Sequence, residues 1–147
     1  MNLNVEKILI IGLGIIGSSI ALASKSKGIK VFGFDKSNKS IKEALEKNII
    51  DSSLDSIDDI DSSDFVKEID LLIIAVPPKQ TLEVFKSLKN IWNTNVTITD
   101  TSSVKNHIKL DDVTNIVLSH PIAGSDRSGI SAANENLFKN KKNVLCD

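Results

Sequence analysis

Three glycines that follow an apolar run form the first pattern with chemical meaning. Gly12, Gly14 and Gly17 stand in the order G-x-G-x-x-G, between a run that ends at Ile11 and a stretch with helical spacing. In such a strand-turn-helix unit, backbone N–H groups and the positive helix end face a bound phosphate, and glycine permits close approach. The pattern predicts a dinucleotide site with a phosphate-binding turn of Gly12, Leu13, Gly14, Ile15, Ile16 and Gly17. A turn that serves packing alone is the competing interpretation.

An acidic residue stands where such a site needs one. Asp35 ends the next expected strand, about 20 positions after the first glycine, which suits the acid that binds the adenosine ribose. A carboxylate there accepts hydrogen bonds from the ribose hydroxyls and repels a 2′-phosphate, so we predict NAD rather than NADP as the cofactor. The adjacent Lys36 weakens that repulsion, and a plain turn or cap role is the alternative for Asp35.

The other candidates also follow expected strands, and ligands of open parallel sheets bind beyond the carboxyl ends of the strands. His120 stands at such an end, where its imidazole can accept a proton near neutral pH. His107 is expected on the surface. The predicted cofactor-binding residues at the same rim are Val76, Pro77, Asp100 and Ser103.

The order of the expected elements predicts the fold. Strands are expected at residues 5–11, 30–34, 69–76, 96–99, 115–119 and 143–146, and helices at residues 15–27, 80–88, 104–109 and 131–138, with a further helix capped by Ser37 or Asn38. Strands that alternate with helices form a mostly parallel sheet. We predict one α/β domain over residues 1–147, a Rossmann-type doubly wound fold.

Side-chain spacing predicts which helix faces are apolar. The first helix should carry Ile16, Ile20 and Ala23 on one face, and the second should turn Ile41 and Leu45 inward, with Ala44 as a third candidate. Residues 52–64, rich in Ser and Asp, are predicted to be a solvated loop or a short amphipathic piece without chemistry.

Composition excludes several classes of protein. Lys and Arg total 18 against 19 for Asp and Glu, so no general positive field is present to hold a nucleic acid. Cys146 has no second cysteine to bridge, which suits a reducing, cytoplasmic setting. Two distant histidines and one cysteine provide no metal-ligand set. The uncharged run at residues 8–23 is broken by glycines, so neither a membrane span nor a signal peptide is expected.

Three motifs in order resemble the prephenate/arogenate dehydrogenase family. They are the glycine turn with Ser18, the run Asp100-Thr101-Ser102-Ser103-Val104-Lys105, and the run His120-Pro121-Ile122-Ala123-Gly124-Ser125-Asp126. The resemblance implies NAD-dependent oxidative decarboxylation of prephenate to 4-hydroxyphenylpyruvate, or of arogenate to tyrosine. It also implies that His120 acts on the substrate's ring hydroxyl with help from Ser103, and that Ser125 and Asp126 bind substrate. For Lys105 two roles are equally open: it contacts the cofactor, or it caps the site.

The resemblance stops short of a helical dimerisation domain that the family carries, and this domain is predicted to be absent. Arg127 is the one arginine available for a substrate carboxylate, and a surface role suits it equally. We therefore expect the chain alone to bind NAD and to turn over prephenate poorly unless a helical domain or subunit completes the site.

Two other functions remain open. A non-catalytic NAD-binding module or partner subunit fits the missing substrate machinery, although Ser103 and His120 argue against it. Another Rossmann dehydrogenase, of the β-hydroxyacid or pyrroline-carboxylate reductase type, would share the glycine turn but not the second and third motifs. A hydrolase built on Asp100, Ser103 and His120 is the weakest alternative, because no G-x-S-x-G elbow is present.

Overall fold

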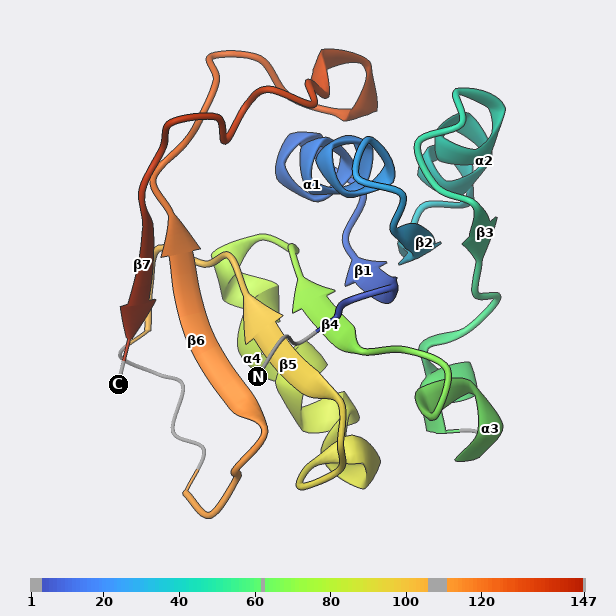
Figure 1. Cartoon of the computed structure of the whole chain (residues 1–147), viewed down its shortest axis with the longest axis vertical. Helices are drawn as coiled ribbons and strands as arrows, with labels where there is room; N and C mark the ends of the chain where they lie inside the picture. The colour runs from blue at the N-terminus through green and yellow to red at the C-terminus, as the bar shows by residue number, and fades with distance from the viewer. Residues whose placement is uncertain (1–3, 62, 106–110, 147) are drawn as a thin grey trace.

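A seven-stranded sheet forms the centre of the molecule. The computed structural model describes residues 4–61, 63–105 and 111–146. In this described chain the strands lie in the order β3-β2-β1-β4-β5-β6-β7 (Figure 1), with β1 to β6 parallel and β7 antiparallel to β6. The chain winds outward from β1 to one edge and then from β1 to the other, which is the doubly wound, Rossmann-type order. The predicted fold class is confirmed.

The elements agree with most of the expected ones. The strands are β1 (Lys7–Ile11), β2 (Lys30–Phe34), β3 (Ser52–Ser53), β4 (Leu71–Ile74), β5 (Thr97–Asp100), β6 (Ile116–Pro121) and β7 (Asn143–Cys146). The helices are α1 (Ile15–Lys25), α2 (Asn38–Glu46), α3 (Ser63–Val66) and α4 (Pro78–Ser87), with 3-10 turns η1 (Ile57–Asp61), η2 (Lys89–Ile91) and η3 (Ile130–Ala132). None of the described helices is long and apolar enough to cross a membrane.

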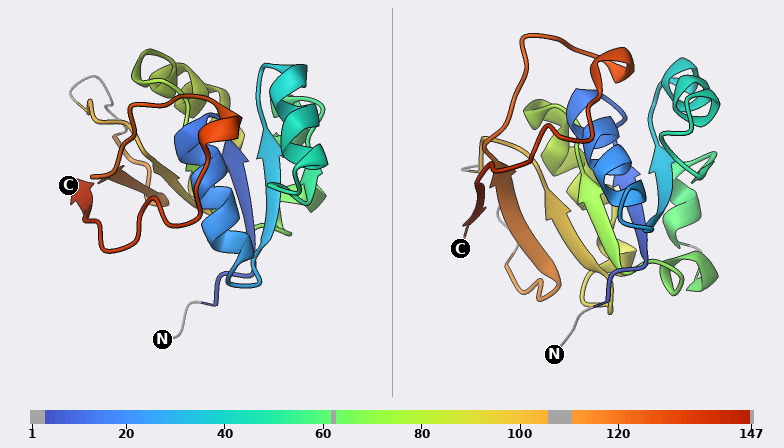
Figure 2. Two further views of the ribbon diagram at one scale, coloured as in Figure 1. Left: turned by 90° about the horizontal axis from the view of Figure 1, so that it is seen from above. Right: turned by 45° about the horizontal axis from the view of Figure 1, so that its top comes forward.

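Alternate residues of the central strands lie on opposite faces of the sheet and belong to two different hydrophobic clusters. On one face, Ile8 and Ile10 of β1 pack with Ala21 of α1 and Ala44 of α2. On the other face, Leu9 and its strand neighbours pack in a cluster that contains α4. Figure 2 shows α1 and α2 on the opposite side of the sheet from α4. Strands covered on both faces read as continuous apolar runs, which is why residues 69–76 were recognisable as a strand.

The register of the sheet aligns the carboxyl ends of its central strands. Ile11 of β1 pairs with Phe34 of β2 and with Ile74 of β4, and Ile74 pairs with Asp100 of β5. Backbone bonds extend one residue further, because Gly12 N–H donates to the Phe34 carbonyl at 2.8 Å and Thr101 N–H donates to the Ile74 carbonyl at 3.0 Å. The residues that follow these strands therefore share one edge of the sheet.

Helix α1 packs against this edge through small residues. Its fully buried members include Ser18, Ser19 and Ala21, whereas Ile16 and Ile20 are only half-buried. The predicted face of Ile16, Ile20 and Ala23 is therefore not the most buried one, because small side chains let the helix come closer to the sheet. Gly17 marks the closest approach: a Cβ there would lie 1.9 Å from the carbonyl oxygen of Gly12.

The helix predicted at residues 131–138 is wrong. Only η3 forms there, and a series of turns follows it. The Asn134 side chain accepts a hydrogen bond from Asn136 N–H at 2.9 Å, and Asn134 N–H donates to the Ser19 hydroxyl at 2.9 Å. An asparagine side chain that captures nearby backbone N–H groups competes with helix formation. This stretch belongs to a long excursion between β6 and β7, residues 122–142, which we call the strap.

Three smaller predictions also need correction. Leu45 is 40% exposed, and Ala44 is the buried residue of the inner face of α2. Residues 52–64 are not a plain loop, because they form β3, η1 and the start of α3 and bury Leu54 and Ile60. The helix expected at residues 104–109 is not seen at Val104 or Lys105, and the rest of it lies outside the described residues.

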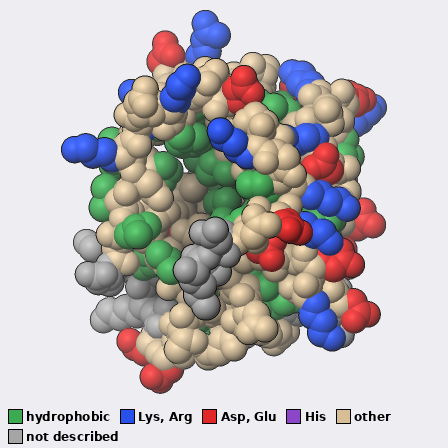
Figure 3. All heavy atoms as spheres, viewed as in Figure 1, with side chains coloured by type: hydrophobic (Ala, Val, Ile, Leu, Met, Phe, Trp, Pro, Cys, Tyr) green, Lys and Arg blue, Asp and Glu red, His purple; other side chains and the backbone are tan. Residues whose placement is uncertain are grey.

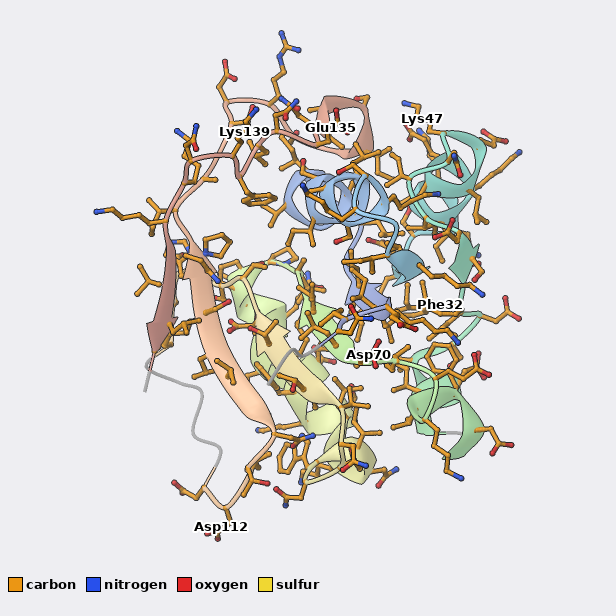
Figure 4. The ribbon with its side chains drawn as sticks, in the orientation of Figure 1. Phe32, Lys47, Asp70, Asp112, Glu135 and Lys139 are labelled. Atoms are coloured by element: carbon orange, nitrogen blue, oxygen red, sulfur yellow. The ribbon has the colours of Figure 1, made fainter. Side chains whose placement is uncertain are left out.

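Asp70 stabilises the start of β1 through its side chain. Its side chain accepts hydrogen bonds from the N–H groups of Glu6 and Lys7, both at 2.9 Å, as β1 begins (Figure 4). Phe32 of β2 packs edge-to-face on Phe65 of α3, with ring centroids 5.2 Å apart. The Asp70 contacts hold the amino end of β1, opposite the edge where the predicted site residues lie.

Replacing Gly17 with alanine should destabilise the fold. The new Cβ would meet the backbone of Gly12, which cannot rotate away, so we expect Gly17→Ala to lower the free energy of unfolding by about 3 kcal/mol. Gly14→Ala is the control, because its Cβ meets nothing within 4 Å, and it should cost less than about 1 kcal/mol. Urea unfolding of both variants measures the difference, and equal stabilities would contradict this packing.

Candidate functional site

A cleft with a volume of about 850 Å³ opens at the carboxyl edge of the sheet. It lies where the chain order reverses between β1 and β4, which is the usual ligand position in a doubly wound sheet. Segments far apart in the sequence line it: the glycine turn, the end of β2, the β4–α4 connection, the residues after β5, and His120. The register brings together the positions that the sequence singled out.

The glycine turn has the geometry of a phosphate cradle. Gly12 has φ of +99°, and a Cβ there would lie 2.6 Å from the Ala75 carbonyl oxygen, so both conformation and space demand glycine. Gly14 caps α1 without a side chain, and nothing lies within 4 Å of the position of its Cβ. The first N–H groups of an α-helix lack partners within the helix, so this open surface presents donors to an anion. The turn therefore fits a dinucleotide's pyrophosphate.

Asp35 holds the glycine turn and the start of α2 together. One carboxylate oxygen accepts from Leu13 N–H and the other accepts from Ser37 N–H, each at 2.8 Å. Ser37 then caps α2, because its hydroxyl accepts from Ser40 N–H at 3.2 Å. Each carboxylate oxygen has a second acceptor site, so Asp35 can hold the turn and still receive hydrogen bonds from ribose hydroxyls in the cleft that it lines.

His120 lies at the other end of the cleft with one ring nitrogen engaged. Its Nδ1 is 3.3 Å from the carbonyl oxygen of Thr101. A carbonyl only accepts, so the contact places the hydrogen on Nδ1 and leaves Nε2 as the acceptor of the neutral ring. Ser103 also lines the cleft, and its exposed hydroxyl has no hydrogen-bond partner in the described part of the chain.

Asp100 lies behind the cleft rather than in it. Its side chain is fully buried, and its carboxylate accepts from Lys105 Nζ at 2.6 Å and from the N–H groups of Ser102 and Ser119, both at 3.1 Å. Lys105 Nζ also donates to the Ser119 carbonyl at 2.6 Å. The pair ties the end of β5 to the end of β6. Lys105 is thus committed to this network, and Asp100 does not line the cleft.

Comparison with known proteins agrees with this arrangement. Residues 20–147 match the family model described as prephenate dehydrogenase, nucleotide-binding domain. The chain belongs to this family. It is 38% identical to prephenate dehydrogenase of Bacillus subtilis (strain 168), in an alignment that covers 99% of this chain and 40% of that protein.

Solved structures of related dehydrogenases have the same fold over nearly the whole of this chain. The fold superposes on A. aeolicus prephenate dehydrogenase, solved in complex with hydroxyphenyl propionate and NAD+, with a TM-score of 0.83 and 30% identity over 100% of this chain and 52% of that one. Synechocystis arogenate dehydrogenase gives a TM-score of 0.81 and 26% identity over 95% of this chain and 49% of that one. The chain thus spans about half the length of these family members or less.

Some predicted site residues of this family member lie outside the cleft. Gly17 and Asp100 do not line it, and neither do Ser125 and Asp126, which are exposed on the strap. Among the described residues Ser125 makes local contacts alone, since its hydroxyl accepts from Arg127 N–H at 3.1 Å and lies 3.4 Å from the Asp126 carboxylate. His107 lies outside the described residues. The roles predicted for these side chains stay predictions.

The cleft also has lining residues that the sequence did not reveal. Ile57 comes from the stretch that was given no chemistry, and Gln80 comes from the first turn of α4. Lys39 and Ser40 of α2 extend the wall beside Asp35, and Ser131 of the strap also lines the cleft. No motif marks these residues. Of these residues, only Lys39 and Ser40 could have been expected at the cleft from the sequence, because they follow Asp35 closely at the end of β2.

A second hollow lies on the α1 side of the sheet. Figure 3 shows hydrophobic side chains gathered around it, and its volume is about 300 Å³. Its lining includes Ile20 of α1, Ile73 of β4 and Leu145 of β7. It contains none of the glycine turn and neither Ser103 nor His120, so the candidate site is the larger cleft.

Removing the Lys105 side-chain charge should destabilise the protein strongly. Asp100 would keep a buried carboxylate without its ionic partner, so we expect Lys105→Met to lower the free energy of unfolding by about 3 kcal/mol. Lys79→Met is the control, since Lys79 is exposed and has no ion pair among the described residues. Denaturant unfolding compares the two. Similar stabilities would show that the pair does not hold the rim.

Proposed function

We propose that the chain binds NAD and supplies the nucleotide-binding half of a prephenate or arogenate dehydrogenase. The observation that carries the proposal is one cleft with a phosphate cradle at one end and a histidine with a free acceptor nitrogen at the other. Family membership and the relative solved with NAD+ support the same function. The products would be 4-hydroxyphenylpyruvate from prephenate or tyrosine from arogenate, with CO2 and NADH.

The reaction needs orientation and one proton acceptor from the protein. When bound, NAD supplies the acceptor for the hydride that leaves the hydroxyl-bearing ring carbon. His120 Nε2 accepts the hydroxyl proton as the ring carboxylate leaves as CO2 and its bonding electrons complete the aromatic ring, and the imidazolium then returns that proton to the phenolic oxygen of the product. The Ser103 hydroxyl positions the substrate or the imidazole from the same wall of the cleft. Aromatisation drives the step, so no covalent intermediate with the protein is required.

Groups beyond this chain complete the substrate pocket in our proposal. Prephenate carries two carboxylates, which favour a bidentate arginine. Among the described residues that line the cleft, the cations are Lys36 and Lys39, both beside the end of β2 and away from His120. Arg127 is exposed on the strap and does not line the cleft. A helical domain or subunit is the proposed source of the missing cation, and cytoplasmic location remains a prediction.

A second candidate function is an NAD-binding module without catalysis. The absence of a carboxylate-binding cation near His120 among the described lining residues favours it. Both functions require NAD binding, so they differ in turnover alone. Assays of the chain alone, and with any separately encoded helical partner, separate them: turnover under either condition supports the dehydrogenase.

Asp35 should determine the choice of cofactor. Asp35→Ala removes the acceptor for the ribose hydroxyls and leaves Lys36 and Lys39 beside the 2′ position. We expect NAD affinity to fall about tenfold and NADP affinity to rise, because a hydrogen bond to a charged group is lost together with charge repulsion. Isothermal titration with both cofactors tests this. Tighter binding of NADP than NAD by the unchanged chain would overturn the assignment.

His120→Asn should abolish catalysis while preserving cofactor binding. Loss of the proton acceptor is expected to lower kcat about 100-fold or more. Absorbance of NADH, with prephenate and then arogenate as substrate, measures the rate in whichever condition supports turnover. NAD affinity should stay within about twofold of the unchanged chain, which shows that the cleft is intact. Undiminished turnover would remove His120 from the mechanism.

A further inference from the structure

The strap, residues 122–142, follows β6 and contributes Ala123, Gly129, Ile130 and Ser131 to the lining of the cleft. Its base is closed by a hydrogen bond of 2.7 Å from Ile122 N–H to the Lys142 carbonyl. Between these ends it carries η3, which packs against both α1 and α2 (Figure 2). Glu135 and Lys139 are exposed on its outer part (Figure 4). A segment distant in sequence from the glycine turn therefore lies beside the helix that the turn begins.

Two contacts hold the strap in this position. Ile130 is 6% exposed and joins the hydrophobic cluster that contains Leu13 and Ala21. Asn134 N–H donates to the hydroxyl of Ser19, a fully buried residue of α1, at 2.9 Å. The anchors thus hold Gly129, Ile130 and Ser131, which line the cleft, against the body of the protein.

The anchored strap places the side chain of one serine, Ser131, at the cleft. Ser131 follows the buried Ile130 directly, lines the cleft, and is exposed. Its hydroxyl has no hydrogen-bond partner among the described residues. The same cleft wall contains Gly14 and Ile15, where α1 offers its unpaired N–H groups.

We propose that the Ser131 hydroxyl donates a hydrogen bond to the diphosphate of the bound dinucleotide. The glycine turn approaches the diphosphate from one side, and the strap supplies a donor from another, so the anion is enclosed instead of lying on an open surface. A hydroxyl is suited to this role because phosphate oxygens are strong acceptors. The inference rests on the proposed function, since it assigns a further contact to the same cofactor.

Ser131→Ala tests the contact, with Ser128→Ala as the matched control. Ser128 is an exposed serine of the same strap that does not line the cleft. We expect Ser131→Ala to weaken NAD about tenfold, in proportion to one hydrogen bond to a charged group, and Ser128→Ala to change nothing. Ser131→Thr keeps the hydroxyl and should retain most of the affinity. Melting temperatures should match, because both serines are exposed.

ADP locates the contact on the ligand. It shares the diphosphate with NAD but lacks the nicotinamide half, so Ser131→Ala should weaken ADP by a factor similar to that for NAD. Unchanged ADP affinity, or equal NAD affinity in the two alanine variants, would overturn the inference while the proposed function stands. Failure of the unchanged chain to bind NAD would overturn the proposed function and this inference together.

Discussion

The structure depends on the close contact of backbones where β1, β4 and α1 meet. Gly12 lies against the Ala75 carbonyl, and Gly17 lies against Gly12, with no room for a Cβ at either position. This contact lets α1 begin directly at the sheet edge, so its N-terminal N–H groups point into the cleft between β1 and β4. The small buried residues of α1, from Gly17 to Ala21, keep the helix at that distance for about one further turn. A larger side chain at the contact would move the helix and the anion site with it.

The same edge is held on its other side by charge rather than by close packing. The buried Asp100 carboxylate gathers donors from Lys105, Ser102 and Ser119, which joins the ends of β5 and β6. A buried carboxylate is costly to desolvate, but here its ammonium partner and two backbone donors compensate it. The two halves of the cleft are thus built by different means: glycine packing where phosphate binds, and an ion pair where the proposed chemistry occurs.

The sequence predicted what depends on local spacing and on the general geometry of parallel sheets. The glycine turn, Asp35 and His120 were found because each was expected at the carboxyl end of a strand, and the register brings the ends of the central strands together. It did not predict what depends on contacts distant in the chain. A helix was predicted at residues 131–138 of the strap because nothing local shows that the Ser19 hydroxyl accepts a hydrogen bond from Asn134 N–H. Nor could the motif around Asp100 show that Lys105 folds back onto its carboxylate.

The Asp100 network also bears on the proposed base. Thr101 follows Asp100 directly, and its N–H is held by the Ile74 carbonyl at 3.0 Å, so the backbone here has little freedom. The Thr101 carbonyl is therefore a fixed acceptor for Nδ1 of His120, which extends from the neighbouring strand. Because a carbonyl stabilises the ring with its hydrogen on Nδ1, Nε2 remains the acceptor of the neutral ring. A neutral ring oriented by a backbone group suits a reaction in which a substrate hydroxyl loses its proton as aromatisation proceeds.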